Sequence, residues 1–129
     1  METKHEARFV NIPPLDIGTK PEQWILTEAC IYQSALTPDL IVVRAGFETD
    51  LASIPRIARF FIVKNGRHRA AAIVHDYLCR LKLDFSRVRA DKIFLEAMKL
   101  RGVPRIRRRL MYWAVRANTS RLKLIGKAR

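Results

Sequence analysis

Four polar residues carry side chains suited to a metal site or to acid–base chemistry: Asp50, His75, Asp76 and Asp91. An imidazole nitrogen combined with carboxylate oxygens suits a divalent metal such as zinc or manganese. The alternative, which we prefer, is a buried polar network in which Asp50 or Asp91 orients His75. Whether the chain is an enzyme stays open at this point, and a bound metal is the less favoured interpretation.

The surroundings of these residues differ. Asp50 comes just before a predicted helix, so it either faces the N-terminus of that helix or closes an Asx-type turn. Helical spacing puts His75 and Asp76 on opposite edges of a buried stripe, so their side chains point in different directions. Asp76 is expected to form an ordinary surface ion pair with Arg80, one helical turn later. Asp91 lies at the rim of the next apolar face, where a buried carboxylate needs partners.

More specific catalytic motifs are missing from the sequence. It has no His-Glu-x-x-His spacing, no phosphate-binding loop and no Gly-x-Ser-x-Gly elbow. Cys30 and Cys79 are the only cysteines, and no Cys-x-x-Cys pair is present. This pattern predicts two reduced and mostly buried thiols.

The first half of the chain has the composition of strands and turns. β-type side chains mark residues 8–12, 23–33 and 40–44 as strands. The Pro38-Asp39 turn predicts a hairpin from about Trp24 to Phe47.

The second half changes to a helical period. Helices are predicted over residues 53–63 and 69–82, between the Ser86 cap and Gly102, and from Pro104 to Asn118. The fold class is therefore α+β, with a small antiparallel sheet or hairpin packed against about four helices. We expect one domain over residues 1–129, with strands and turns in 1–52, helices in 53–118 and a basic tail in 119–129.

The last predicted helix combines an apolar stripe with many arginines. Its stripe is expected to face the core, through Ile106, Leu110, Trp113, Ala114 and Ala117. Its outward face would then be formed by Arg105, Arg108, Arg109 and Arg116. On this reading Trp113 is a core residue.

The charge is divided unevenly along the chain. Residues 1–53 have four basic and eight acidic side chains, a net charge of −4. Residues 54–129 have 21 basic and four acidic ones, a net charge of +17. Such asymmetry predicts an interface with nucleic acid, an acidic protein or an anionic surface. The expected contact residues are Arg105, Arg107, Arg108, Arg109, Arg116, Arg121 and Lys123.

The sequence gives no sign of secretion or membrane insertion. The N-terminus has acidic residues where a signal peptide needs a basic start, and the longest apolar stretches, 60–63 and 70–74, are too short to span a bilayer. We therefore expect no membrane span and synthesis in the cytoplasm.

Three sequence blocks resemble a phage and prophage family known only as a domain of unknown function (number 1353). The blocks are Gly46-Phe-x-Thr-Asp-x-Ala-Ser-Ile-Pro55, Ala72-x-x-His-Asp-x-Leu78 and Ala90-Asp-x-Ile-Phe-x-Glu-Ala-Met98, within about 40–115. Members are small phage-encoded proteins, and similar genes are often seen among tail or late genes. The chain departs from the pattern at Cys79, where an aromatic residue is expected. The resemblance implies a phage context and no established activity.

The leading hypothesis is a virion or virion-assembly protein, associated with the tail, that docks through its arginine face onto other phage structural proteins. It would be made in the host cytoplasm and found in the virion, within a hetero- or homo-oligomeric assembly. The first alternative is a metal-dependent hydrolase, directed at the cell wall, that uses the Asp/His cluster. The second is a DNA-binding accessory protein, because arginines contact phosphates and aromatic rings stack on bases.

Overall fold

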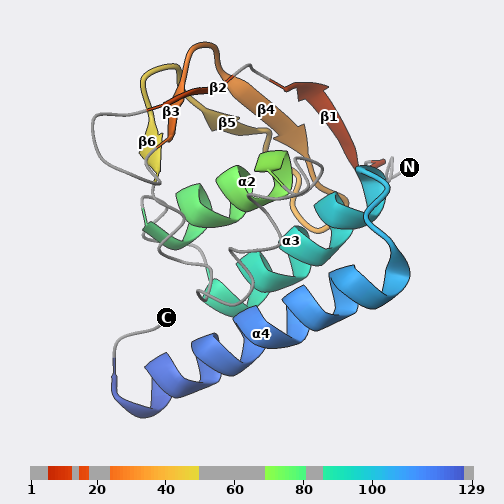
Figure 1. Cartoon of the computed structure of the whole chain (residues 1–129), viewed down its shortest axis with the longest axis vertical. Helices are drawn as coiled ribbons and strands as arrows, with labels where there is room; N and C mark the ends of the chain where they lie inside the picture. The colour runs from red at the N-terminus through yellow and green to blue at the C-terminus, as the bar shows by residue number, and fades with distance from the viewer. Residues whose placement is uncertain (1–5, 13–14, 18–23, 50–68, 81–85, 127–129) are drawn as a thin grey trace.

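The computed structural model describes residues 6–12, 15–17, 24–49, 69–80 and 86–126, and in these ranges a layer of short strands lies on one side of three helices (Figure 1). The strands form two antiparallel sheets of three. One sheet has the order β1 (Arg8–Asn11), β4 (Cys30–Gln33), β5 (Ile41–Val43). The other has the order β2 (Leu15–Ile17), β3 (Trp24–Leu26), β6 (Glu48–Thr49).

The predicted hairpin is present, but its first strand is divided. β4 and β5 pair antiparallel across the turn that contains Pro38 and Asp39. The sequence suggests one strand over residues 23–33, whereas β3 and β4 belong to different sheets. Leu26, at the end of β3, exchanges backbone hydrogen bonds with Gly46 (2.7 Å) and Phe47 (3.1 Å) and so joins the second sheet. The β-type side chains in this segment do not reveal such a change of partner.

The helices are stacked outward from the strands in the order of the sequence. Next to β4 and β5 lies α2 (Arg69–Arg80), then α3 (Arg87–Leu100), and outermost α4 (Arg105–Leu124) (Figure 1). Because α2 has the sheet on one side and α3 on the other, it is buried nearly all round, with only Arg80 exposed and Arg69 and Tyr77 half-buried. Within the described residues, no helix has both the length and the apolar character that crossing a membrane requires.

Local signals place both ends of α3 where the sequence predicts. The Ser86 side chain accepts a hydrogen bond from the Arg89 backbone N–H, which is the expected N-cap contact. Gly102 has a positive φ of 77°, a conformation that costs a side-chain-bearing residue free energy, and its N–H bonds the carbonyl of Lys99. The chain can therefore reverse direction and start α4 directly after Pro104.

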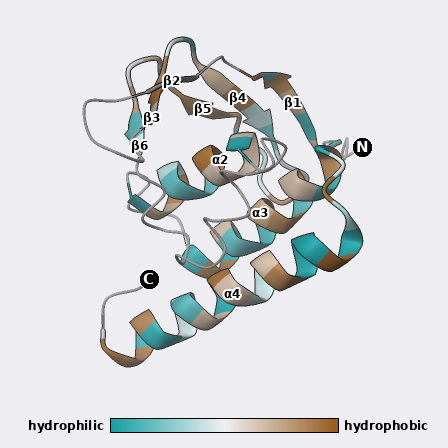
Figure 2. Ribbon diagram, viewed as in Figure 1, coloured by the Kyte–Doolittle hydropathy of each residue, from teal (hydrophilic) through white to brown (hydrophobic). Residues whose placement is uncertain are grey.

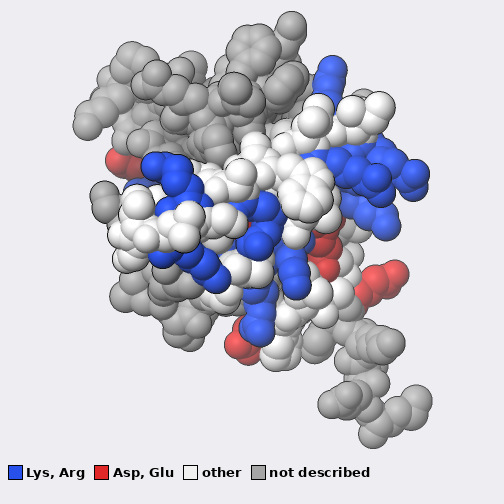
Figure 3. Space-filling view, turned by 90° about the horizontal axis from the view of Figure 1, so that it is seen from below, with Lys and Arg blue, Asp and Glu red and all other residues white. Residues whose placement is uncertain are grey.

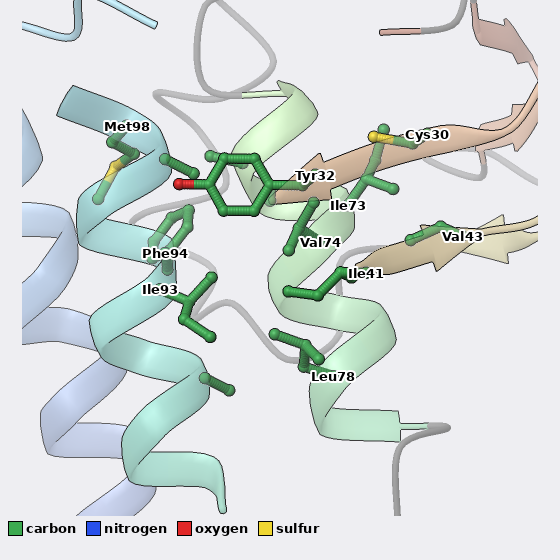
Figure 4. Packing of buried hydrophobic residues seen from close by; sticks show 14 of the residues in the cluster. Cys30, Tyr32, Ile41, Val43, Ile73, Val74, Leu78, Ile93, Phe94 and Met98 are labelled. Atoms are coloured by element: carbon green, nitrogen blue, oxygen red, sulfur yellow. The ribbon is translucent and has the colours of Figure 1, made fainter. Parts of the chain in front are cut away.

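The hydrophobic core lies between the first sheet, α2 and α3. Figure 4 shows Tyr32 and Ile41 from the strands meeting Val74 and Leu78 from α2 and Phe94 from α3. All five side chains are buried, so packing against both neighbours fixes the position of α2.

Glu96 ties the hairpin to α3, a contact that the sequence does not suggest. The Tyr32 hydroxyl donates to its Oε1 at 2.6 Å, and the Ala35 backbone N–H donates to its Oε2 at 3.2 Å. Burial and, to a smaller extent, the Glu96 carboxylate raise the pKa of Tyr32.

The last helix is rotated relative to the sequence prediction. Ile106, Leu110 and Trp113, expected in the core, are 75%, 60% and 66% exposed, and Ala117 is exposed as well. Ala114 is half-buried and packs against the core. Apolar segments recur along the whole of α4 (Figure 2), so its composition alone does not identify the buried side.

A second stripe faces α3 instead. Met111, Val115 and Thr119 are the buried residues of α4. Thr119 donates a hydrogen bond to the Asp91 carboxylate of α3 (2.6 Å). A buried carboxylate without partners is costly, and the Thr119 face of α4 brings a hydroxyl donor to Asp91.

The rotation of α4 also changes which of its arginines are exposed. Arg105 and Arg109 are exposed as expected. Arg108 and Arg116 are half-buried, with Nη1 of Arg108 on the Val103 carbonyl and Nη1 of Arg116 on Asp91, each at 3.4 Å. The predicted arginine face is therefore incorrect for these two residues.

The α+β class is confirmed, with strands in the N-terminal half and three helices among the described C-terminal residues. The predicted helix over residues 53–63 lies outside the described residues. The final helix continues past Asn118 to Leu124, through part of the segment expected to be a basic tail.

Candidate functional site

The centre of the candidate site is a histidine–carboxylate contact between α2 and α3. His75 Nε2 lies 2.6 Å from Asp91 Oδ1, and both side chains are 0% exposed. His75 also packs against the Phe94 ring, with ring centroids 5.0 Å apart. The geometry matches the role of Asp91 in the predicted polar network, as the residue that orients His75.

The other carboxylate oxygen of Asp91 brings in the third helix. Oδ2 accepts from Thr119 Oγ1 at 2.6 Å and from Arg116 Nη1 at 3.4 Å. Thr119 Oγ1 in turn accepts from Arg87 Nε at 3.2 Å. One buried carboxylate thus contacts α2 and α4 from its place on α3. Its partners on α4 were not predicted, because Thr119 falls in the segment expected to be a tail.

Cys79 completes a group of three possible metal ligands. It follows His75 by one helical turn, and its Sγ lies 3.6 Å from His75 Nε2 and 3.9 Å from Nδ1. One ligand atom from each of His75, Cys79 and Asp91 lies within 4.8 Å of the others. Nitrogen, sulfur and oxygen donors in one buried group suit zinc in particular.

The spacing of residues in the sequence indicates that Cys79 lies near His75, although composition alone does not. Residues four apart on a helix share a face, and His75 and Cys79 have this spacing. Both cysteines are buried, as predicted. Their settings differ, because burial raises the pKa of Cys30 to about 12, whereas Cys79 lies against the imidazole.

The charge of the cluster follows from its geometry. Burial lowers the pKa of His75, but the neighbouring Cys79 and the hydrogen-bonded Asp91 raise it, to about 9 overall. In its protonated form His75 donates from Nε2 to the Asp91 carboxylate and forms an ion pair with it. This buried ion pair has its second oxygen satisfied by Thr119, as a stable buried pair requires.

Asp76 belongs to a different cluster. Its carboxylate accepts from the Thr49 hydroxyl of β6 and from Arg80 Nη1 at 2.8 Å. Arg80 also donates to the Glu48 carbonyl at 3.2 Å and lies over the Phe47 ring, 5.6 Å from its centroid. The predicted pairing of Asp76 with Arg80 exists. It is not a surface pair, however, because the Asp76 side chain is 0% exposed.

Of the four predicted residues, the structure brings together His75 and Asp91. Asp76 holds α2 to the strand end, and its side chain points in a different direction from that of His75, as the helical spacing suggests. Asp50 lies outside the described residues. The cluster is enclosed, so a macromolecular substrate cannot reach its atoms without movement of the helices, whereas a metal ion needs far less room.

The outer face of α4 is the second candidate site. We use this name for its exposed apolar residues Ile106, Leu110, Trp113, Ala117 and Leu124 together with the exposed basic residues Arg105, Arg107, Arg109, Arg121 and Lys123. In Figure 3, many basic side chains lie among uncharged ones on the side of the molecule where α4 lies. Neither α2 nor α3 covers this face.

These contacts define a small α+β protein in which a buried histidine–carboxylate cluster joins three helices. Residues 24–115 match the family model described as "Protein of unknown function (DUF1353)". Because this match covers more than half of the chain, the protein belongs to that family. The matched segment contains His75, Cys79 and Asp91 and ends before Thr119. No curated protein and no solved structure matches the chain.

Proposed function

We propose that this protein is a phage virion or virion-assembly component, associated with the tail, which docks onto an acidic partner through the outer face of α4. The virion and tail context comes from the phage-encoded proteins that its sequence blocks resemble. The docking role rests on the composition and exposure of α4.

The exposed apolar side chains between arginines are the observation that carries the proposal. Ile106, Leu110 and Trp113 are each at least 60% exposed and lie on one side of the helix. Soluble monomers rarely expose large apolar side chains together, and a contiguous patch with a polar rim marks an interaction site. Trp and Arg are also the residues most enriched among those that dominate binding energy.

The proposal is tested by locating the protein in particles produced by a strain that carries its gene. Mass spectrometry of purified particles should find the chain at a copy number that fits a symmetric ring. A protein that is abundant in the cell and missing from the particles would overturn the virion assignment.

A matched pair of variants tests the docking face. Four exposed basic residues of that face, Arg105, Arg107, Arg109 and Arg121, are changed together to Gln. The control changes four exposed basic residues elsewhere, Arg44, Lys92, Lys99 and Arg101, to Gln and alters the net charge equally. Only the first variant should be lost from particles, and equal incorporation of both would refute docking through α4.

A divalent metal site, part of a metal-dependent hydrolase, is the second candidate function, and the proximity of Cys79 to His75 and Asp91 favours it. Three protein ligands leave one tetrahedral position for water, as in catalytic zinc sites. Protein purified without chelator should then carry about one equivalent of zinc, and Cys79→Ala should lose it. Cys30→Ala is the control, because Cys30 is also buried but belongs to β4. If the purified protein carries no metal and zinc does not change its melting temperature, the structural network is the only interpretation that remains.

A further inference from the structure

The exposed apolar residues of α4 recur with the spacing of a coiled-coil seam. Ile106, Leu110, Trp113, Ala117, Ser120 and Leu124 are separated by four, three, four, three and four residues. This alternation is the a/d pattern of heptads, with Leu110, Ala117 and Leu124 at a and the others at d. All six are exposed, and Ser120 is the single polar member.

The positions that flank this seam are basic. The e positions are Arg107, Ala114 and Arg121, and the g positions are Arg109, Arg116 and Lys123. Five of these six residues are basic and none is acidic. Residues at e and g set the choice of partner in coiled coils, because they form the charge pairs between the helices.

This charge pattern argues against a second copy of the same helix as the partner. A parallel pair would place g residues of one copy against e residues of the other, and an antiparallel pair would place e against e and g against g. Every charged contact would then be basic against basic, which is unfavourable. An acidic helix would turn the same contacts into ion pairs.

The shape of the face favours a helix over nucleic acid or a membrane surface. The apolar strip is one seam wide, with arginines or a lysine on both sides, whereas helices that lie in a bilayer bury a broad apolar face. On nucleic acid the arginines would contact phosphates, and the apolar row between them would face a charged backbone. A partner helix covers the seam and the charges together.

We propose that the outer face of α4 pairs with an amphipathic helix of a partner protein, which has apolar residues at its seam and Glu or Asp at its flanking positions. This inference rests on the proposed docking function and specifies the partner. With 20 residues in α4, the seam extends for about 30 Å, at about 1.5 Å per residue. That length accommodates about three heptads.

Synthetic peptides of about three heptads test the pairing. The probe peptide has Leu and Ile at its seam and Glu at e and g, and the control peptide has Lys in place of Glu. Binding is followed by calorimetry and by Trp113 fluorescence in a Trp24→Phe background, since these are the two tryptophans. The acidic peptide should bind at least about tenfold more tightly than the basic one, with a blue shift of the emission.

Paired variants show whether the seam itself is used. Leu110→Ser with Trp113→Ser should weaken calorimetric binding of the acidic peptide by at least about tenfold. Leu36→Ser with Leu40→Ser, which alters two exposed leucines near the hairpin turn, should leave the affinity unchanged. Equal loss in both pairs would overturn the inference.

The same binding assay tests the other possible partners of the outer face of α4. Binding to duplex DNA or to anionic vesicles without binding to the acidic peptide would overturn the helical partner, and so would self-association through this face in sedimentation experiments. If the α4 arginine variant is lost from particles while no peptide binds, docking stands and the acidic-helix inference fails. If the peptide binds but particles lack the protein, the pairing stands and the virion assignment fails.

Discussion

At the scale of single residues, Asp91 connects all three helices of the buried cluster. Its two oxygens contact His75 on α2 and Thr119 on α4, and Arg116 adds a longer contact. Removing one member of such a buried network leaves a buried donor or acceptor of another member unsatisfied, which costs more than the hydrogen bond contributed.

Thr119 is the simplest member to change. Thr119→Val keeps the shape of the side chain and removes the donor to Asp91, so the free energy of unfolding should fall by about 1–3 kcal/mol. Thr119→Ser, which keeps the hydroxyl, is the control and should lose clearly less. Chemical denaturation of both variants measures the difference, and equal losses would show that the hydroxyl contributes nothing.

The pKa of His75 predicts how the free energy of unfolding depends on pH. Its pKa is raised from 6.5 to about 9 in the folded protein, so the folded state binds the proton more tightly than the unfolded state. The resulting stability is fully present below pH 6.5 and is lost as the pH rises through about 9. Its size is on the order of a few kcal/mol, at about 1.4 kcal/mol per pH unit.

Thermal unfolding with a chelator present checks this prediction. The melting temperature of the native protein should fall across that pH window. His75→Gln, which does not titrate, should be less stable at pH 6.5 and show a flatter curve. Parallel curves for the two proteins would mean that His75 is not protonated in the folded state.

At the scale of the elements, Gly102 determines how α3 connects to α4. Its φ of 77° disfavours residues with a side chain, although the space around its α-carbon is open. Gly102→Ala should therefore lower the free energy of unfolding by about 1 kcal/mol. Gly102→Asn should lose less, because asparagine tolerates this conformation better. Equal denaturation midpoints for both variants and the native protein would contradict the expected strain.

The elements also show what the sequence could and could not predict. Strong local signals, such as the Ser86 cap and Gly102, predicted the ends of α3. The rotation of α4 was not predictable in the same way, because the helix has one apolar stripe through Trp113 and another through Met111. Burial of the second stripe goes with contacts between segments far apart in the sequence, such as that of Thr119 with Asp91.

Prediction of the site was limited for the same reason. His75 and Asp91 were found from their apolar surroundings. Asp76 was grouped with them by residue type, whereas the fold turns it toward Thr49. The sequence predicts Cys79 only as a buried thiol, although its helical spacing from His75 indicates a shared face. Spacing within one helix is readable from a sequence, but the direction in which a packed helix turns each polar side chain is not.

At the scale of the whole molecule, the dominant feature is the net charge of +13. Like charges on α4 repel one another in the folded state, and salt screens this repulsion. Added sodium chloride should therefore raise the melting temperature of the native protein. A higher melting temperature at low salt, and a smaller rise with salt, is expected for the variant at Arg105, Arg107, Arg109 and Arg121. The control variant at Arg44, Lys92, Lys99 and Arg101 removes charges that are more dispersed. Its melting temperature should therefore differ less from that of the native protein. A native melting temperature that falls with salt would contradict this prediction.

The Asp91 carboxylate also links the interior of the molecule to its outermost helix. A proton or metal ion that alters the charge at His75 changes how firmly Oδ2 holds Thr119, and thus α4. Conversely, a partner that shifts α4 changes the electric field at His75. Thermodynamic reciprocity requires the two effects to be equal in free energy. We therefore expect a partner that displaces Thr119 to shift the ionisation of the enclosed imidazole by the same free energy as the imidazole's charge shifts the binding of that partner.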